Sequence, residues 1–357
     1  MHLKINKIAC LWVGFLSIFV CTSCQCAFSK DKQYSKTYFE YFDTIITIIG
    51  YEKQEAAFIE KTTQIEKLLQ EYNQLYDIYY AYQGINNLYT VNQQAGKQPV
   101  KVDQKIIDLI VYAKDMYEKS HQMMNIAMGP VLALWHQARS FAMDYPEQAS
   151  IPTMQDLEQA NLYTNINDII IDEVNQTLLL KEEGMSIDVG AIAKGFATEE
   201  IAKYLMQAGE IPYVINAGGN IRVLGLKPDG SQWNVGIQNP DLSSSQSQIE
   251  IVSIRNLAVV TSGSYQRYFT VAGKQYHHII SPVTLMPSDT FVSVTVVSPH
   301  SGMADALSTA LFNLSIEEGM ALIAKLEQTE AMWIDANYQI HYSTHFQDYQ
   351  YQGGKYE

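Results

Sequence analysis

The chain has 357 residues, of which 47% are apolar and 17% are charged, and its net charge is −14. This composition is that of a globular protein and excludes a disordered one. The acidic balance argues against nucleic-acid binding, which needs clustered Lys and Arg, but a small phosphate-bearing ligand can still bind at one local site.

The N-terminal segment has the pattern of an export signal. Lys4 and Lys7 precede an apolar run at residues 8–20, which is too short to span a bilayer. Thr22 and Ser23 then stand directly before Cys24, as in a bacterial lipobox. We therefore expect residues 1–23 to be a lipoprotein signal peptide and Cys24 to be lipidated, which would anchor the protein on the extracytoplasmic side of the bacterial cell membrane. A plain signal peptide or an uncleaved anchor is the alternative.

All four cysteines lie before residue 27. The remainder of the chain therefore has no disulfide framework, no thiolate nucleophile and no Cys-ligated zinc. Any chemistry in the folded part must use oxygen and nitrogen groups.

The pattern of apolar residues predicts one α+β domain at residues 37–345, after a polar tether at 24–36 and before a flexible tail at 346–357. Asp103 is a plausible N-cap for one of its helices. The mixture indicates a single mixed α/β unit with a mostly antiparallel sheet. The expected strands are 42–49, 166–171, 177–180, 185–189, 213–215, 221–224, 233–237, 249–254, 265–271, 291–297, 331–334 and 339–342, and the expected helices are 55–80, 103–117, 129–138, 190–208, 302–314 and 316–326.

The stretch from Asp188 to Ala197 predicts a strand that leads straight into a helix opened by small residues. Helix N-termini expose unpaired N–H groups and favour anions, and Lys194 adds a positive charge there. A tight packing turn with a solvated Lys is an equally good interpretation of the spacing alone.

Asp305 and Thr309 are four residues apart and share one face of a predicted helix. A carboxylate and a hydroxyl in this arrangement can give two oxygen ligands to magnesium, which needs few protein ligands. Taken alone, an acidic residue near a helix start and a core Thr explain the same pattern.

Two further motifs carry polar groups. His277 and His278 are adjacent in a predicted strand and point to opposite faces, so one of them can enter a site as a general base. The segment from Asn216 to Asn220 predicts a hairpin turn that needs positive φ. An ordinary pair of His residues and a simple turn remain the alternatives.

Taken together, the motifs resemble the ApbE family of FAD:protein FMN transferases. The resemblance runs from Phe42 to about Trp333, and it implies a T-fold-like α+β architecture. Its pieces, in chain order, are Asn125–Trp135, Asp188–Phe196, Asn216–Asn220, Trp233–Pro240, Thr261–Tyr268, His277–Ile280 and Ala304–Thr309.

The resemblance implies a reaction in which a Thr or Ser hydroxyl of an exported acceptor protein attacks the FMN phosphate of FAD and AMP leaves. The acceptor pattern that it implies is Asp-x-(Ser/Thr)-Gly-(Ser/Ala)-Thr, which we do not find in this chain, so the acceptor would be another protein. The implied roles are Mg²⁺ ligation by Asp305, Thr309 and the backbone carbonyl of Ala191, FAD contact by Asn125, Asp188, Lys194 and Ile279, and a place nearest the transferred phosphate for His278.

The chain departs from the family pattern at several positions. Asn125 and Ala127 stand where the family usually has Asp and Thr, and residues 281–285 read Ser-Pro-Val-Thr-Leu in place of Asp-Pro-x-Thr-Gly. A missing carboxylate at Ser281 is expected to weaken the orientation of His278. These departures leave two alternatives open, which are an FAD pyrophosphatase that uses water and a flavin-binding lipoprotein without catalysis.

Overall fold

Eight antiparallel strands form the main sheet of the computed structural model, which describes residues 31–353 apart from 208 and 210. Each neighbouring pair runs antiparallel, which confirms the mostly antiparallel sheet. In sheet order the strands are β1 (Lys32–Tyr41), β2 (Thr44–Glu52), β6 (Tyr213–Ala217), β7 (Asn220–Leu224), β10 (Ala258–Gly263), β13 (Phe291–Ser298), β14 (Glu330–Asp335) and β15 (Ile340–Tyr342).

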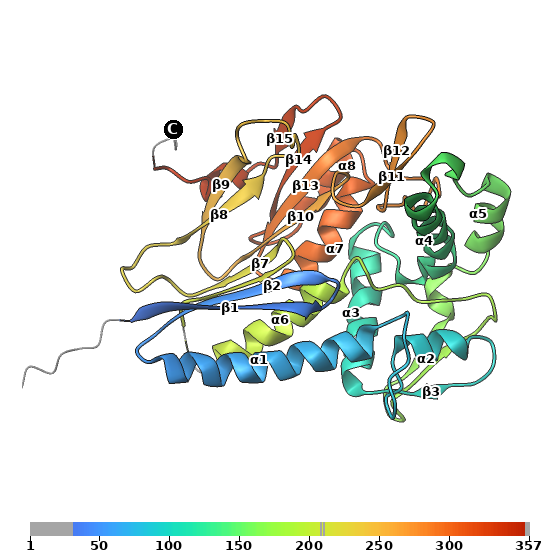
Figure 1. Cartoon of the computed structure of the whole chain (residues 1–357), viewed down its shortest axis with the longest axis horizontal. Coiled ribbons are helices and arrows are strands. Elements are labelled where there is room, and N and C mark those ends of the chain that lie inside the picture. Colours follow the sequence, from blue (N-terminus) through green and yellow to red (C-terminus); the bar gives the residue numbers. More distant parts are fainter. Residues whose placement is uncertain (1–30, 208, 210, 354–357) are drawn as a thin grey trace, which may run out of the picture. The chain divides into compact units, whose positions relative to one another are not determined.

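Both faces of the sheet are covered, which explains why its central strands are buried along most of their length. One face packs on α1 (Glu55–Tyr76), α6 (Ala193–Met206) and α7 (Ser301–Phe312), and the other on the hairpin of β8 (Trp233–Gln238) and β9 (Gln248–Ile254). Within β13, Val294 shares a core cluster with Leu311 of α7, whereas Val297 shares another with Trp233 of β8. Figure 1 shows α6 and α7 beside each other under this sheet.

The remaining elements lie mainly at one end of the sheet, where α4 and the hairpin β11–β12 are neighbours (Figure 1). They are α2 (Leu88–Gln93), β3 (Val100–Lys101), α3 (Gln104–Lys119), η1 (Ile126–Met128), α4 (Gly129–Asp144), η2 (Pro146–Gln148), α5 (Met154–Asn161), η3 (Ile166–Asp168), β4 (Ile169–Asp172), β5 (Thr177–Leu180), β11 (Tyr268–Val271), β12 (Lys274–His277), α8 (Ile316–Ile323) and η4 (Phe346–Tyr349). In the part of the chain that the structure describes, no helix has the length and apolar character needed to cross a membrane.

Two local predictions are confirmed in detail. Asp103 caps α3, because its side chain accepts a hydrogen bond of 2.8 Å from the backbone N–H of Lys105. The turn between β6 and β7 has positive φ at both Gly218 (60°) and Gly219 (88°), a conformation that glycine adopts without steric cost.

The expected tether and tail are both wrong where the structure describes them. Residues 32–36 belong to β1, which pairs with β2 and is held by Tyr38, whose hydroxyl donates to the Thr62 carbonyl at 2.7 Å. The tail is also folded, since η4 begins at Phe346 and that side chain is fully buried. In both segments a few aromatic residues supply the burial while the polar majority faces solvent, so composition alone suggested a loose chain. The signal peptide and Cys24 lie outside the described residues.

The secondary-structure prediction also missed α2 and α5, gave no bounds for β12, and fails at two places close to the candidate site. Residues 185–189 are extended but form no strand, and the backbone N–H of Asp188 donates instead to the Ile126 carbonyl. The expected strand at 265–271 begins only at Tyr268, whereas β10 just before it was missed. The sequence of β10 ends in Thr, Ser and Gly, which resembles a loop, although its pairing with β7 and β13 makes it a central strand.

Candidate active site

The start of α6 packs directly against α7 at Asp305. One Asp305 carboxylate oxygen accepts a 2.8 Å hydrogen bond from the backbone N–H of Gly195, and the Lys194 ammonium lies 3.4 and 3.5 Å from the two oxygens. A Cβ at Gly195 would stand 2.5 Å from the Asp305 Cβ and 2.6 Å from the Ser301 carbonyl. Glycine is therefore required for the close approach of the two helices, and this approach brings a cation and a nearly buried carboxylate together.

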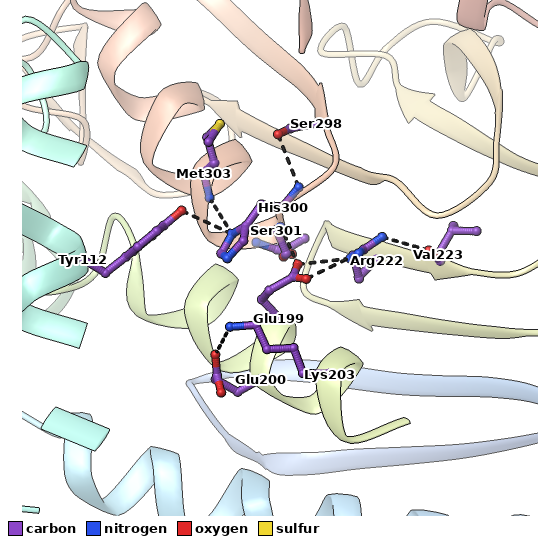
Figure 2. Close-up of polar contacts among 11 residues, drawn as sticks. Tyr112, Glu199, Glu200, Lys203, Arg222, Val223, Ser298, His300, Ser301 and Met303 are labelled. Carbon is purple, nitrogen blue, oxygen red and sulfur yellow. Dashed lines mark hydrogen bonds and ion pairs between the residues drawn. The ribbon is translucent and has the colours of Figure 1, made fainter. Parts of the chain in front are cut away.

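A buried ion pair fixes the same two helices one turn further along (Figure 2). Glu199 of α6 and Arg222 of β7 have side chains that are only 4% and 5% exposed, and they are joined at 3.0 Å. The same Glu199 oxygen accepts a 2.7 Å hydrogen bond from the backbone N–H of Ser301, the first residue of α7. One carboxylate thus ties α6, β7 and the N-terminus of α7 together, and its charge suits the positive end of the α7 dipole.

The residues before and after Ser301 extend this junction. His300 caps α7, because its ring Nδ1 accepts from the Met303 N–H, and its ring stacks on Tyr112 with centroids 5.1 Å apart (Figure 2). The Ser301 hydroxyl donates to the amide oxygen of Asn220. The Asn220 amide nitrogen is buried beside Gly195 and has no hydrogen-bond acceptor among the described residues. The α6–α7 contact therefore contains one unsatisfied polar donor.

We expect Glu199→Gln to destabilise the protein by about 3–5 kcal/mol, because removing one partner leaves the Arg222 guanidinium as an uncompensated buried charge. Thermal or denaturant unfolding measures this loss. Lys203→Gln is the matched control, since Lys203 makes an exposed ion pair with Glu200 and its loss should change stability by less than about 1 kcal/mol. Equal stabilities for the two variants would show that the buried pair does not hold the junction.

His277 is the last residue of β12 and His278 follows the strand, so the expected pair of strand residues is only half confirmed, and the two rings have different surroundings. The His277 ring donates from Nε2 to the Ser288 carbonyl and accepts at Nδ1 from the Ile279 N–H, so both of its nitrogens are used within the fold. The His278 ring is half-buried, and its Nδ1 lies 3.2 Å from the Arg267 carbonyl, to which it donates. This bond leaves Nε2 of His278 as the ring nitrogen that can accept a proton.

The pocket in front of His278 is also lined by His136 and Arg139 of α4. Burial, followed by the positive charge of Arg267, lowers the pKa of His278 to about 3. Burial also lowers the pKa of His136, although the charge of Asp188 opposes that shift. Both rings are therefore neutral near pH 7, and the positive charge at this pocket comes from Arg139, which lines it, and from Arg267, which acts on both rings.

The structure gives the other predicted site residues distinct environments. Asn125 caps η1 by accepting from the Ala127 N–H and donates to the Thr164 carbonyl, so its side chain has a structural role. Asp188 accepts from the Gly190 N–H at 2.8 Å, Ile279 is buried, and Ala191 and Thr309 are half-buried.

The Ser281 departure does not leave His278 without orientation. The Ser281 hydroxyl accepts from the N–H groups of Val283 and Thr284 in a local turn, whereas the Arg267 carbonyl holds the His278 ring. Leu285, at the family's usual Gly position, has a φ of 60°, a conformation that favours glycine. Its carbonyl accepts from the buried Trp135 indole at 2.9 Å, which helps to hold this turn against α4.

The model of the ApbE family matches residues 42–333 of the chain. The chain belongs to the ApbE family.

Curated relatives and solved structures agree with this assignment. The chain is 32% identical over 343 residues to the FAD:protein FMN transferase of Treponema pallidum (strain Nichols), with 92% of each chain covered. It is 34% identical over 248 residues to one from Klebsiella pneumoniae (strain 342), which covers 69% of this chain and 74% of that protein. The expectation of an enzyme of the transferase class is thereby confirmed.

Two ApbE crystal structures share the fold. The flavin transferase ApbE from Vibrio cholerae has a TM-score of 0.74 at 26% identity and covers 89% of this chain and 99% of its own. The ApbE protein of Thermotoga maritima has a TM-score of 0.78 at 24% identity, with 90% and 100% covered. The expected fold class is therefore confirmed.

The oxygen groups that the family resemblance implies as metal ligands are few. Among the described residues no three His, Cys, Asp or Glu side chains gather as a metal cluster. The donors that the family resemblance implies are one carboxylate (Asp305), one hydroxyl (Thr309) and one carbonyl (Ala191). Such a set fits magnesium, which keeps several waters and binds phosphates, better than zinc. Lys194 lies against Asp305, so a cation there would share this carboxylate with the ammonium group.

Sequence reasoning missed the residues that surround the ApbE motifs in space. Glu199 and Arg222 form the buried pair, and His136 and Arg139 line the His278 pocket. The sequence offered little signal for the second pair, because His136 falls within the expected helix at 129–138 but Arg139 lies one residue beyond its predicted end, whereas α4 runs to Asp144. Nothing in the sequence could pair Glu199 with Arg222, because strand order decides that contact.

Proposed function

We propose that the chain transfers FMN from FAD to a Thr or Ser hydroxyl of another protein in a magnesium-dependent reaction that releases AMP. The observation that carries this proposal is the α6–α7 junction, where Lys194 and the nearly buried Asp305 meet at a helix start. A cation at a helix N-terminus can bind a pyrophosphate, and a carboxylate beside it can hold the metal ion that neutralises the phosphates. The names of the curated relatives support the choice of FAD and protein as substrates.

The chemistry would need little covalent participation by the enzyme. The acceptor oxygen forms a bond to the phosphorus of the FMN half, the phosphorus–oxygen bond to AMP breaks, and AMP leaves with the bridging oxygen. The acceptor hydroxyl proton passes to Nε2 of His278, because Nδ1 carries the hydrogen that donates to the Arg267 carbonyl. The charge of Lys194 stabilises the pyrophosphate oxygens.

Magnesium would be held by Asp305, Thr309 and the carbonyl of Ala191, and when bound it would neutralise the charge of the phosphates. The acceptor in this proposal is an exported protein with an Asp-x-(Ser/Thr)-Gly-(Ser/Ala)-Thr segment. Lipidation at Cys24 would keep the enzyme on the same side of the membrane as that acceptor.

Mass spectrometry of an acceptor incubated with the purified chain, FAD and Mg²⁺ tests the proposal. We expect the acceptor to gain one FMN group, and the same acceptor with its last motif Thr changed to Ala to gain none. Release of AMP at the same rate with and without acceptor, and no FMN on either protein, would identify an FAD pyrophosphatase instead. FAD that binds but yields no AMP would identify a non-catalytic flavin-binding protein.

A further inference from the structure

Arg139 is a cation without an acidic partner at the pocket that contains His278. Its side chain lines that pocket together with His136, one turn earlier on α4. Among the described residues no carboxylate lies within ion-pair distance of Arg139, whereas Arg222 binds Glu199 and Arg267 reaches Asp43 at 3.5 Å. An arginine that lines a pocket and lacks a counter-ion is suited to bind an anionic group of a ligand.

The surroundings of Arg139 reinforce its positive charge. Arg139 and Arg267 both act on His278 and on His136 as neighbouring positive charges. The chain has a net charge of −14, so a pocket lined by Arg139, with Arg267 nearby, is a local exception on an acidic protein, although the charge of Asp188 also acts on His136. A ligand group with negative charge would be attracted to this pocket and repelled by most of the remaining surface.

The face of α4 that carries Arg139 also continues out to solvent. His136, Arg139 and Met143 are three and four residues apart and therefore lie on one side of the helix. Met143 is 72% exposed, and the 59% exposed Tyr79 bonds to His136 at 3.2 Å. These four residues, which we call the α4 platform, combine one cation with exposed apolar and aromatic groups. Such a composition is typical of surfaces that bind proteins.

We propose that the α4 platform docks the acceptor segment and that Arg139 binds a carboxylate on that segment. This inference rests on the proposed transfer of FMN to a protein. In that reaction Lys194 and Asp305 on α6 and α7 serve the pyrophosphate, whereas the acceptor hydroxyl must arrive from solvent at His278. His136 and Arg139 of the α4 platform line the pocket that contains His278, and the acidic residue of the proposed acceptor pattern is complementary in charge to Arg139.

A double-mutant cycle between Arg139→Gln and the acceptor tests the contact directly. The acceptor is used in two forms, one with the Asp of its motif and one with Asn at that position. We expect Arg139→Gln to raise the KM for the Asp acceptor about ten- to hundredfold, as for loss of a charged hydrogen bond. The KM of the wild-type enzyme for the Asn acceptor should be raised by a similar factor. Combining Arg139→Gln with the Asn acceptor should raise the KM little further.

Two controls separate this contact from other effects. Lys325→Gln removes the same charge from an exposed position after α8 and should leave the KM for the acceptor unchanged. FAD affinity of each variant, measured by fluorescence titration, reports whether the substitution disturbs the dinucleotide site. Arg139→Glu tested with an acceptor that carries Arg in place of Asp should regain part of the lost affinity.

Three results would overturn the inference. Losses that simply add in the cycle would show that Arg139 and the acceptor Asp do not touch. A raised Kd for FAD with an unchanged KM for the acceptor would assign Arg139 to the dinucleotide. A wild-type enzyme that modifies no acceptor of either form would overturn the proposed function together with the docking surface, whereas the first two results would leave the transferase intact.

Discussion

Replacing Asp305 with Ala should lower the rate of FMN transfer by several orders of magnitude while the protein still folds. Asp305 is the one carboxylate in the proposed metal site, so its loss would remove most of the charge that holds a cation beside the pyrophosphate. Its removal also leaves the buried Gly195 N–H without an acceptor, which should cost about 1–3 kcal/mol of stability. Initial rates across a range of Mg²⁺ concentrations measure the first effect, and thermal unfolding measures the second.

Two substitutions separate charge from packing at this position. Asp305→Asn keeps an oxygen that can accept from Gly195, so it should restore stability without restoring the rate. Thr309→Val keeps the shape and removes one oxygen donor, so it should reduce the rate less and respond to added Mg²⁺. Near-normal turnover of Asp305→Ala at low Mg²⁺ would show that α7 does not hold the metal.

Replacing His278 with Ala should reduce FMN transfer by a factor of about 10²–10⁴, the usual contribution of a general base. The His278 ring is already oriented, because Nδ1 donates to the Arg267 carbonyl and Nε2 remains available to accept a proton. Burial and the charge of Arg267 lower the pKa of the ring, so it is neutral near pH 7. Single-turnover rates with saturating FAD and acceptor measure the effect on chemistry apart from binding.

His277 provides a matched control, because it is the adjacent ring and both of its nitrogens bond within the fold. We expect His277→Ala to lower the melting temperature more than His278→Ala does, while His278→Ala lowers the rate of the folded enzyme more. An unchanged single-turnover rate for His278→Ala would leave proton removal to water or to another group.

Much of the fold could be predicted because local signals agree with the final packing. The β-branched run at 42–49 predicted the strand that the structure has as β2, and the two glycines predicted the hairpin turn at Gly218–Gly219. β1 and η4 could not be predicted in this way, since their stability comes from a few aromatic side chains that pack on distant elements. Tyr38, for example, depends on a carbonyl of α1 that is 24 residues away.

The motifs of the candidate site were visible, but their spatial relations were not. Spacing placed Asp305 and Thr309 on one helix face and Lys194 near a helix start. The approach of Lys194 to Asp305 joins residues 111 positions apart, so it depends on how α6 and α7 pack against the sheet. The proposed role of Arg139 was harder to predict from the sequence. That role depends on the absence of an acidic neighbour among the described residues, which only the three-dimensional structure can show.

The carboxylate that Glu199 shares between Arg222 and α7 also limits where the sequence can vary during evolution. Because Glu199 bonds to both Arg222 and the first N–H of α7, the alignment of the two helices is set by side chains and not by the length of the intervening chain. The segment between β7 and β13, with its two hairpins, can therefore gain or lose residues in exposed turns without moving Asp305 relative to Gly195. Insertions and deletions among related sequences should therefore concentrate in those turns, whereas the residues of the α6–α7 junction should vary little.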